Sequence, residues 1–220
     1  MPQHMYREIE RLKKKILSLS ALVEESLRSA IKCIETRNVA LARSAIDADP
    51  LIDEMEVEVE EECLKALALY QPVAADLRYI IIVLKINNDL ERIGDLAVNI
   101  AEESIRLSSL PAVDPPFDLD TMSEKVHQMV SRSLDCLINL DGELARQICA
   151  SDDDVDNLYR DMFPKVRETA HRQPEVLQQM IHYMEVSHNL ERIADHATNI
   201  AEDIIYMIKG NIVRHKVKTS

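Results

Sequence analysis

The residues best suited to chemistry in this sequence are acidic pairs that occur in two copies of one stretch. The stretch Asn88–Glu103 returns one hundred residues later as His188–Asp203, with ten of sixteen positions identical. Each copy contains Glu-x-x-x-Asp, and a four-residue step places both side chains on one face of a helix. Two carboxylates stacked there repel each other unless a positive charge lies between them. The candidate cation ligands of the two copies are Glu91, Asp95, Glu191 and Asp195.

A further pair of carboxylates with the same spacing precedes each copy. These pairs are Asp49 with Asp53, and Asp152 with Asp156. When two helices fold back as an antiparallel hairpin, residues at equal height have sequence numbers that add to a constant. If the chain folds back at Gln71-Pro72, Asp53 lies at the height of Glu91, and Asp49 lies at the height of Asp95. In the second half, Asp156 is matched with Glu191 and Asp152 with Asp195 in the same way. The sequence therefore predicts that four carboxylates meet in each half.

The chemistry of these groups favours metal ions that prefer oxygen ligands. Mg²⁺, Ca²⁺, Mn²⁺ and iron suit an all-oxygen group, and Zn²⁺ fits with fewer oxygens and a histidine. Three neighbouring polar residues are secondary candidates as ligands: Asn99, Asn199 and His188. The spacing does not choose among the metals. The competing interpretation is that the acids form solvated helix faces, because the chain has 39 acidic residues.

Helical angles place the acids on the outside of the molecule. In the first copy the apolar residues fall within a narrow arc that must face the interior, and the acids lie on the opposite side. The apolar residues are Ile86, Leu90, Ile93, Ala97 and Ile100. A carboxylate-bridged, metal-dependent hydrolase is the alternative function, but hydrolytic metal sites usually need an enclosing pocket. We therefore predict external cation sites, a position that disfavours the hydrolase.

Several basic side chains of the repeats receive structural interpretations. Arg92 and Arg192 are predicted to form surface ion pairs, and His196 to pack or to form a hydrogen bond at the edge of the core. The rule of equal heights, by which the sequence numbers of facing residues add to a constant, places His188 beside Tyr159. This position argues against a buried di-iron centre of the ferritin type.

The elements that must position these residues are long helices. Helical periodicity and turn signals predict six of them. Their approximate ranges are Met5–Arg37, a second helix ending at Tyr70, Val73–Leu107, Asp120–Asn139, Glu143–His171, and a sixth ending near Lys209-Gly210. Asp49-Pro50 is either an interruption of the second helix or its first turn. Three prolines and two serines in residues 108–120 mark the boundary between halves. We predict an all-α protein with two tandem three-helix bundles, residues 1–110 and 111–220.

Composition and charge restrict the class of protein. The chain has 220 residues, of which 46% are hydrophobic and 4% aromatic, which agrees with helices around a sizeable core. A formal charge of −13 argues against nucleic acid and against an anionic membrane surface as partners. No apolar run reaches the length of a membrane span, and the amino terminus lacks the apolar segment of a signal peptide. We expect a cytoplasmic protein whose four cysteines are reduced.

Three motifs resemble those of the PhoU family of phosphate-uptake regulators. They are QPVAADLR (residues 71–78), LKINNDLERIGDLAVNIAE (84–102) and LERIADHATNIAEDIIYMIKG (190–210). The resemblance covers nearly the whole chain, and it implies two similar three-helix bundles, a homodimer and no catalytic activity. It also implies a cytoplasmic accessory protein that links the ATPase subunit of a phosphate ABC transporter to a phosphate-sensing histidine kinase. Such a protein represses the phosphate-starvation response when phosphate is ample, and reaches the membrane only through its partners.

The resemblance also implies a metal site. Some family members bind iron or zinc through E/D-x-x-x-D motifs, which correspond here to Asp49, Asp53, Glu91, Asp95, Asp152, Asp156, Glu191 and Asp195. Family members need not bind phosphate directly, and the sequence has no glycine-rich loop for it. The second half has EVLQQM at residues 175–180 where the first has the ADLR motif. We therefore expect the halves to differ in the partners that they contact.

Overall fold

A computed structural model describes residues 3–210 of the chain, and within them the fold consists of helices without any strand. The long helices are α1 (Gln3–Thr36), α2 (Val39–Tyr70), α3 (Ala74–Ser108), α4 (Leu119–Asn139), α5 (Gly142–Arg172) and α6 (Leu177–Lys209), with a short 3₁₀ turn η1 (Pro174–Val176) before α6. The predicted all-α class and the six helices are confirmed. None of the described helices has the length and apolar character that a membrane span requires.

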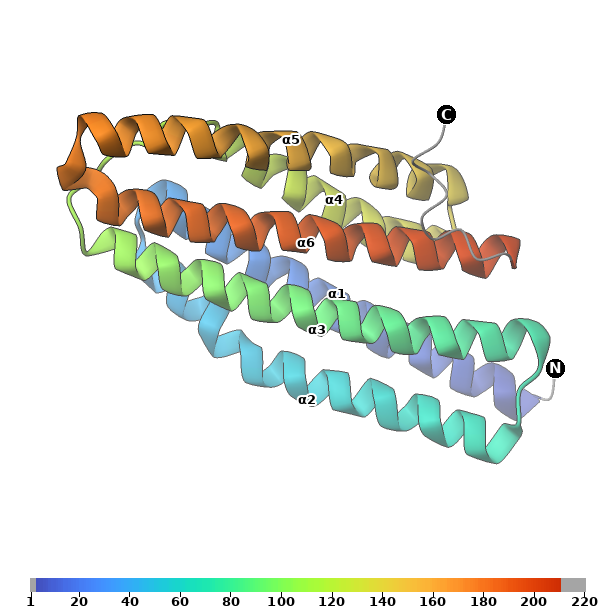
Figure 1. Cartoon of the computed structure of the whole chain (residues 1–220). Coiled ribbons are helices and arrows are strands. Elements are labelled where there is room, and N and C mark those ends of the chain that lie inside the picture. The colour runs from blue at the N-terminus through green and yellow to red at the C-terminus, as the bar shows by residue number, and fades with distance from the viewer. Residues whose placement is uncertain (1–2, 211–220) are drawn as a thin grey trace.

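The helix ends follow from local sequence signals. Asn38, Asp118 and Asp141 cap α2, α4 and α5, because each side chain accepts a hydrogen bond from a backbone N–H in the first turn. Gln71 ends α2 in the left-handed conformation, with φ 44°, directly before Pro72. The structure corrects one expectation. Pro50 is neither an interruption nor a first turn, because α2 continues through it, and Figure 1 shows the early part of α2 bent relative to the rest.

The six helices run alternately up and down and form two bundles that join along α3 and α6 (Figure 1). The predicted interior stripe of α3 is fully buried, and its counterparts on α6, such as Ile193 and Ile200, are equally inaccessible. Buried residues of both bundles belong to one continuous apolar core. Burying each Leu or Ile side chain contributes about 1.5–3 kcal/mol. The two halves are therefore expected to depend on each other for stability.

Three polar contacts cross between α3 and α6 and fix their relative register. Lys85 Nζ lies 2.8 Å from an oxygen of Asp203. Two histidines of α6, His196 and His182, lie 2.8 Å from Asp89 and 2.6 Å from Glu103 of α3. Among these contacts, the residue numbers on α6 decrease as those on α3 increase, so the two helices are antiparallel. The hydrogen-bonding role predicted for His196 is confirmed.

The segment between the halves is held by side chains from both. The guanidinium of Arg37, at the end of α1, donates hydrogen bonds to the carbonyls of Leu107 and Leu110. From α6, the hydroxyl of Tyr183 donates to the carbonyl of Val113 at 2.8 Å. These contacts fasten the connecting segment to the junction of the bundles.

Candidate metal site

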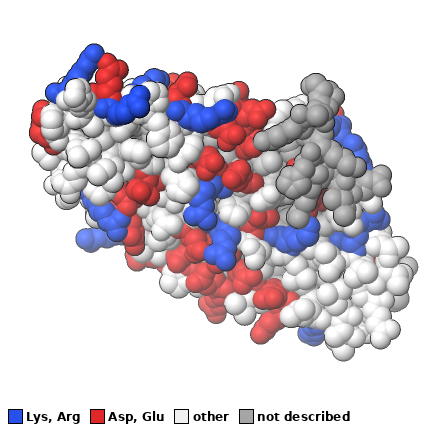
Figure 2. Space-filling model, viewed as in Figure 1, with Lys and Arg blue, Asp and Glu red and all other residues white. Residues whose placement is uncertain are grey.

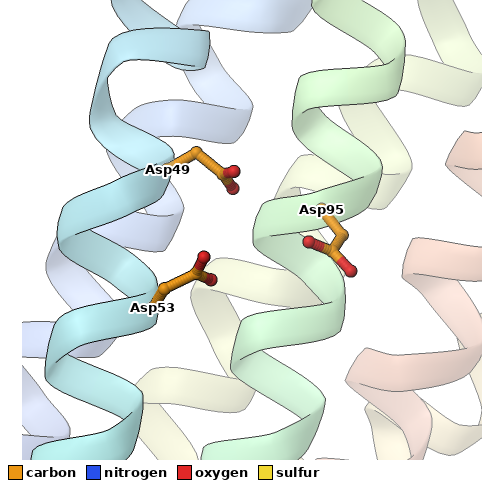
Figure 3. A group of neighbouring side chains, drawn as sticks. All are labelled: Asp49, Asp53 and Asp95. Carbon is orange, nitrogen blue, oxygen red and sulfur yellow. The ribbon is translucent and has the colours of Figure 1, made fainter.

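Three of the predicted carboxylates form a compact group in the first half. Asp49 and Asp53 extend from successive turns of α2 toward α3, where Asp95 lies beside them (Figure 3). One carboxylate oxygen from each of the three lies within 4.8 Å of the others. Asp53 is exposed, whereas Asp49 and Asp95 are half-buried. Asp95, which helical angles placed on the outer side of α3, is partly accessible, and the spacing of the three acids brings three oxygen ligands within reach of one cation.

A close approach of α2 to α3 lies next to this group. Gly94 precedes Asp95, and a Cβ atom at position 94 would lie 3.2 Å from the Cδ1 and Cγ2 atoms of Ile52. That distance is tighter than ordinary van der Waals contact, so the glycine allows the two helices to pack closely there. Ile52 in turn neighbours Asp53 in the sequence. The second copy of the motif has Ala194 at the corresponding position.

Asp49 is the acid of this group whose ionised form a bound cation would stabilise most. Its Oδ1 atom is buried and accepts no hydrogen bond from the described part of the protein. Burial raises the pKa of Asp49, and repulsion from Asp53 and Asp95 raises it further. A buried carboxylate oxygen without a partner destabilises the folded state. A metal ion between the three aspartates would supply the missing partner, so the residues present fit an oxygen-ligated cation.

Glu91, the fourth predicted ligand, lies at the edge of the group. Burial raises its pKa, repulsion from Asp95 adds to this, and the neighbouring Arg92 lowers it. Arg92 lies 3.3 Å from Glu91 and 3.4 Å from Asp95, which confirms the surface ion pairs predicted for it. Exposed ion pairs of this kind contribute only about 0–1 kcal/mol. Arg92 therefore compensates part of the negative charge at the rim of the group.

Glu56 belongs to the same acidic surface, although it lies outside the pairs that the sequence motifs predict. Burial raises its pKa, with further contributions from Glu60 and Asp53. Its Oε1 atom accepts a hydrogen bond of 2.9 Å from Asn87 Nδ2. A three-residue step from Asp53 places Glu56 one turn along the same face, so helical spacing alone would have identified it.

In the second half the four acids are neighbours without forming a comparable group. Burial raises the pKa of Glu191, and repulsion from Asp195, Asp156 and Asp152 adds to it. Their oxygens nevertheless do not gather as tightly as those of the first half, within residues 3–210. Thr198 Oγ1 donates a hydrogen bond of 3.3 Å to Asp152. The four acids of the second half therefore meet as predicted but without the compact group of three oxygens seen in the first half, and cation binding there stays a prediction.

The corresponding residue of the first half differs in its capacity to form a hydrogen bond. Val98 occupies the position that Thr198 has in the second copy, and a valine has no hydroxyl to donate. Asp49 thus lacks the hydrogen bond that Asp152 receives. The two halves therefore differ beside their acidic residues at two positions: Val98 corresponds to Thr198, and Gly94 corresponds to Ala194.

Of the secondary candidates, His188 and Asn199 belong to the second half, and Asn99 lies one helical turn beyond Asp95 on α3. Nδ1 of His188 is 3.3 Å from the hydroxyl of Tyr159, as the rule of equal heights predicted, and 4.0 Å from a Glu191 oxygen. Asn99 and Asn199 are exposed on α3 and α6.

The described cysteines form no disulfide. Three of them are buried, and burial raises the pKa of Cys63 and of half-buried Cys149 to about 12. Thiolate chemistry at neutral pH is therefore disfavoured.

The raised pKa values predict how cation binding depends on pH. In the metal-free protein, ionised Asp49 and Glu91 oppose folding at neutral pH, and this penalty is relieved as the pH falls through their raised pKa values. Protons and the cation compete for the same oxygens. We expect the rise in melting temperature caused by Mn²⁺ to shrink between about pH 7 and about pH 4. Thermal unfolding with Mn²⁺ or EDTA at each pH measures this, and a constant Mn²⁺ effect over the range would contradict it.

Comparison with known proteins agrees with the geometry. The family model of the PhoU domain matches the chain twice, over residues 16–104 and 119–204. A phosphate-specific transport system accessory protein PhoU homolog of Aquifex aeolicus is 39% identical over 96% of each chain. PhoU homolog 1 of Thermotoga maritima is 35% identical over 94% of this chain and 90% of its own length.

Solved structures give the same result. The crystal structure of PhoU from Pseudomonas aeruginosa has a TM-score of 0.90 and 32% identity, and the match covers 94% of this chain and 99% of that one. The phosphate transport system regulatory protein PhoU from Streptococcus pneumoniae has a TM-score of 0.87 at 26% identity, over 95% and 99% of the two chains. The duplicated domain, the relatives matched over most of their length and the matching folds together show that the chain belongs to the PhoU family.

Proposed function

We propose that this protein is a non-enzymatic regulator of phosphate uptake. It couples the ATPase subunit of a phosphate ABC transporter to a sensor histidine kinase, and it represses the phosphate-starvation response when phosphate is ample. The observation that carries the proposal is the pair of PhoU domains, matched over residues 16–104 and 119–204. Relatives that match over nearly their full length are named accessory proteins of the phosphate-specific transport system.

The proposed regulator carries metal on its surface. The group of Asp49, Asp53 and Asp95 is the favoured position, and iron or zinc is the family's precedent, with Mg²⁺, Ca²⁺ and Mn²⁺ chemically suited as well. The group lies on the outer side of α2 and α3, with Asp53 exposed. This position supports a structural or sensory role for the metal over a hydrolytic one, because hydrolytic centres usually enclose their substrate.

The proposed protein acts in the cytoplasm as a homodimer. It reaches the membrane through the transporter and the kinase, and its charge of −13 disfavours direct contact with nucleic acid or anionic lipid. Phosphate itself is not a required ligand in this proposal, because the signal is passed through protein contacts.

Deletion of the gene tests the regulatory role. We expect a deletion strain to express alkaline phosphatase in phosphate-rich medium at the level of phosphate-starved cells, because the kinase is no longer held inactive. Reintroducing the intact chain should restore repression. An unchanged phosphatase level in the deletion strain would contradict the proposal, and metal-dependent phosphatase activity of the purified chain would favour the alternative hydrolase.

A further inference from the structure

The outer face formed by α3 and α6 has an internal two-fold relationship. The two helices carry the duplicated stretch, they are antiparallel, and they lie side by side at the junction of the bundles (Figure 1). The contacts that join Lys85 to Asp203 and Asp89 to His196 bring the equivalent residues Ile93 and Ile193 to about the same height. A pseudo-two-fold axis therefore passes between these two isoleucines.

Two pairs of exposed apolar side chains are related by this axis. Leu77 and Ile81 on α3 are 39% and 38% exposed, and their equivalents on α6, Leu177 and Ile181, are 47% and 49% exposed. Each pair has the four-residue spacing that places both side chains on one helical face. Single exposed apolar residues are ordinary on protein surfaces, but the same pair retained at both symmetric positions is not explained by packing within this chain.

The distance between the pairs follows from helix geometry. Ile81 and Ile181 each lie twelve residues from the axis, in opposite directions along the antiparallel helices. At 1.5 Å per residue this is roughly 18 Å on each side, so the nearest ends of the two pairs are about 36 Å apart. A partner that contacts both pairs must therefore have two apolar recesses with this separation.

The surface between the pairs is charged. A groove of about 530 Å³ lies between α3 and α6 beside Ile81, and its lining includes Asp89, Glu202 and Asp203 together with the single cation Lys85. Figure 2 shows many Asp and Glu side chains across the middle of this face, with Lys and Arg side chains among them. The complementary partner surface is therefore basic between its two apolar recesses.

We propose that the α3–α6 face docks one two-fold symmetric protein dimer, each of whose subunits receives one of the two apolar pairs. The dimer axis coincides with the pseudo-two-fold axis, and the basic strip of the partner lies over the acidic groove. One Leu-Ile pair buries too little apolar surface to bind tightly by itself. Two pairs on one rigid chain engage both subunits together, which raises the affinity well above that of either contact alone.

The choice of test partner rests on the proposed function. The nucleotide-binding subunits of ABC transporters work as two-fold dimers that close on ATP, so the cognate phosphate-transporter ATPase is the probe. A hydrolysis-deficient ATPase with ATP supplies the dimer, and the nucleotide-free protein supplies the monomer. With the ATPase in excess, we expect each protomer of this chain to bind one ATPase dimer, so that the proposed homodimer carries two of them by analytical ultracentrifugation, and binding at least about tenfold weaker to the monomer.

Paired substitutions test the two contacts separately. Leu77→Ser with Ile81→Ser, and Leu177→Ser with Ile181→Ser, should each weaken binding to the dimer by about tenfold or more, because each removes one anchor. The control is Leu51→Ser with Leu69→Ser, two residues of α2 that are 48% and 64% exposed. They share a helical stripe with Glu58, which contacts Lys15 of α1, so they lie away from the α3–α6 face. Helicity and melting temperature confirm that each variant is folded.

The outcomes separate this inference from the proposed function. Comparable losses from both apolar variants with an unchanged control would support symmetric docking. Binding of one protomer per ATPase subunit, or a loss from only one of the two variants, would overturn symmetric docking and leave the regulatory role standing. Failure of the unaltered chain to bind either form of the ATPase would overturn both.

Discussion

Replacing Asp49 by asparagine is expected to abolish metal-dependent stabilisation and to make the metal-free protein more stable. In the metal-free state the buried Oδ1 atom of Asp49 has no hydrogen-bond partner and lies among carboxylates. An asparagine removes the charge and offers an amide that donates to Asp53 or Asp95. Relief of an unsatisfied buried group of this kind contributes about 1 kcal/mol to folding.

The same change removes one of three ligands from the metal. Altering groups that merely support a ligand costs about 10–100-fold in metal affinity, so loss of a ligand should cost at least about 100-fold. At a metal concentration 100 times its dissociation constant, binding stabilises the folded state by about 2.7 kcal/mol. Asp49→Asn should lose nearly all of this gain, so the variant is more stable than the parent without metal and less stable with it.

Thermal and urea unfolding with Mn²⁺, Zn²⁺ or EDTA measures both effects, and elemental analysis of protein purified without chelator reports the bound metal. Asp152→Asn is the matched control, because Asp152 is the equivalent residue and accepts a hydrogen bond from Thr198. Asp53→Ala combined with Glu91→Ala supplies a second variant at the first site. Equal metal content in the parent and in both first-site variants would refute the site.

A cavity at Leu90 is expected to unfold both halves together. Leu90 lies on α3, has no exposed surface and belongs to the core that the two bundles share. Leu90→Ala removes apolar contacts and leaves a cavity, which in a close-packed core costs about 2–5 kcal/mol. Because α3 packs against α6 as well as against α1 and α2, the loss should destabilise the second bundle equally.

Urea unfolding gives the free energy, and hydrogen exchange read by mass spectrometry follows amides of α3 and α6 separately. We expect one cooperative transition and the same loss of protection in both helices. Leu69→Ala is the surface control, since that side chain is 64% exposed, and it should change stability by less than about 0.5 kcal/mol. Full protection of α6 in the Leu90→Ala variant would show that the bundles unfold independently.

The arrangement of the acids shows how far helical geometry carries a prediction. The spacing of four residues and the rule of equal heights correctly brought Asp49 and Asp53 to Asp95, because both depend only on the rise and pitch of a helix. The same rule predicted an equal cluster in the second half, where the structure has none as compact. Height fixes a position along the helix axis, but not the distance between two helices or the hydrogen-bond partner that a carboxylate finds.

The sequence by itself determined the six helices, their buried faces, the duplication and the family, because these follow from local periodicity and from motifs that a single stretch contains. It did not determine that α2 continues through Pro50, nor that α3 and α6 pair Lys85 with Asp203 and Glu103 with His182. Those contacts join residues about one hundred positions apart. Only the packing of one bundle against the other sets their register, since it is the shared core that fixes how the two faces meet.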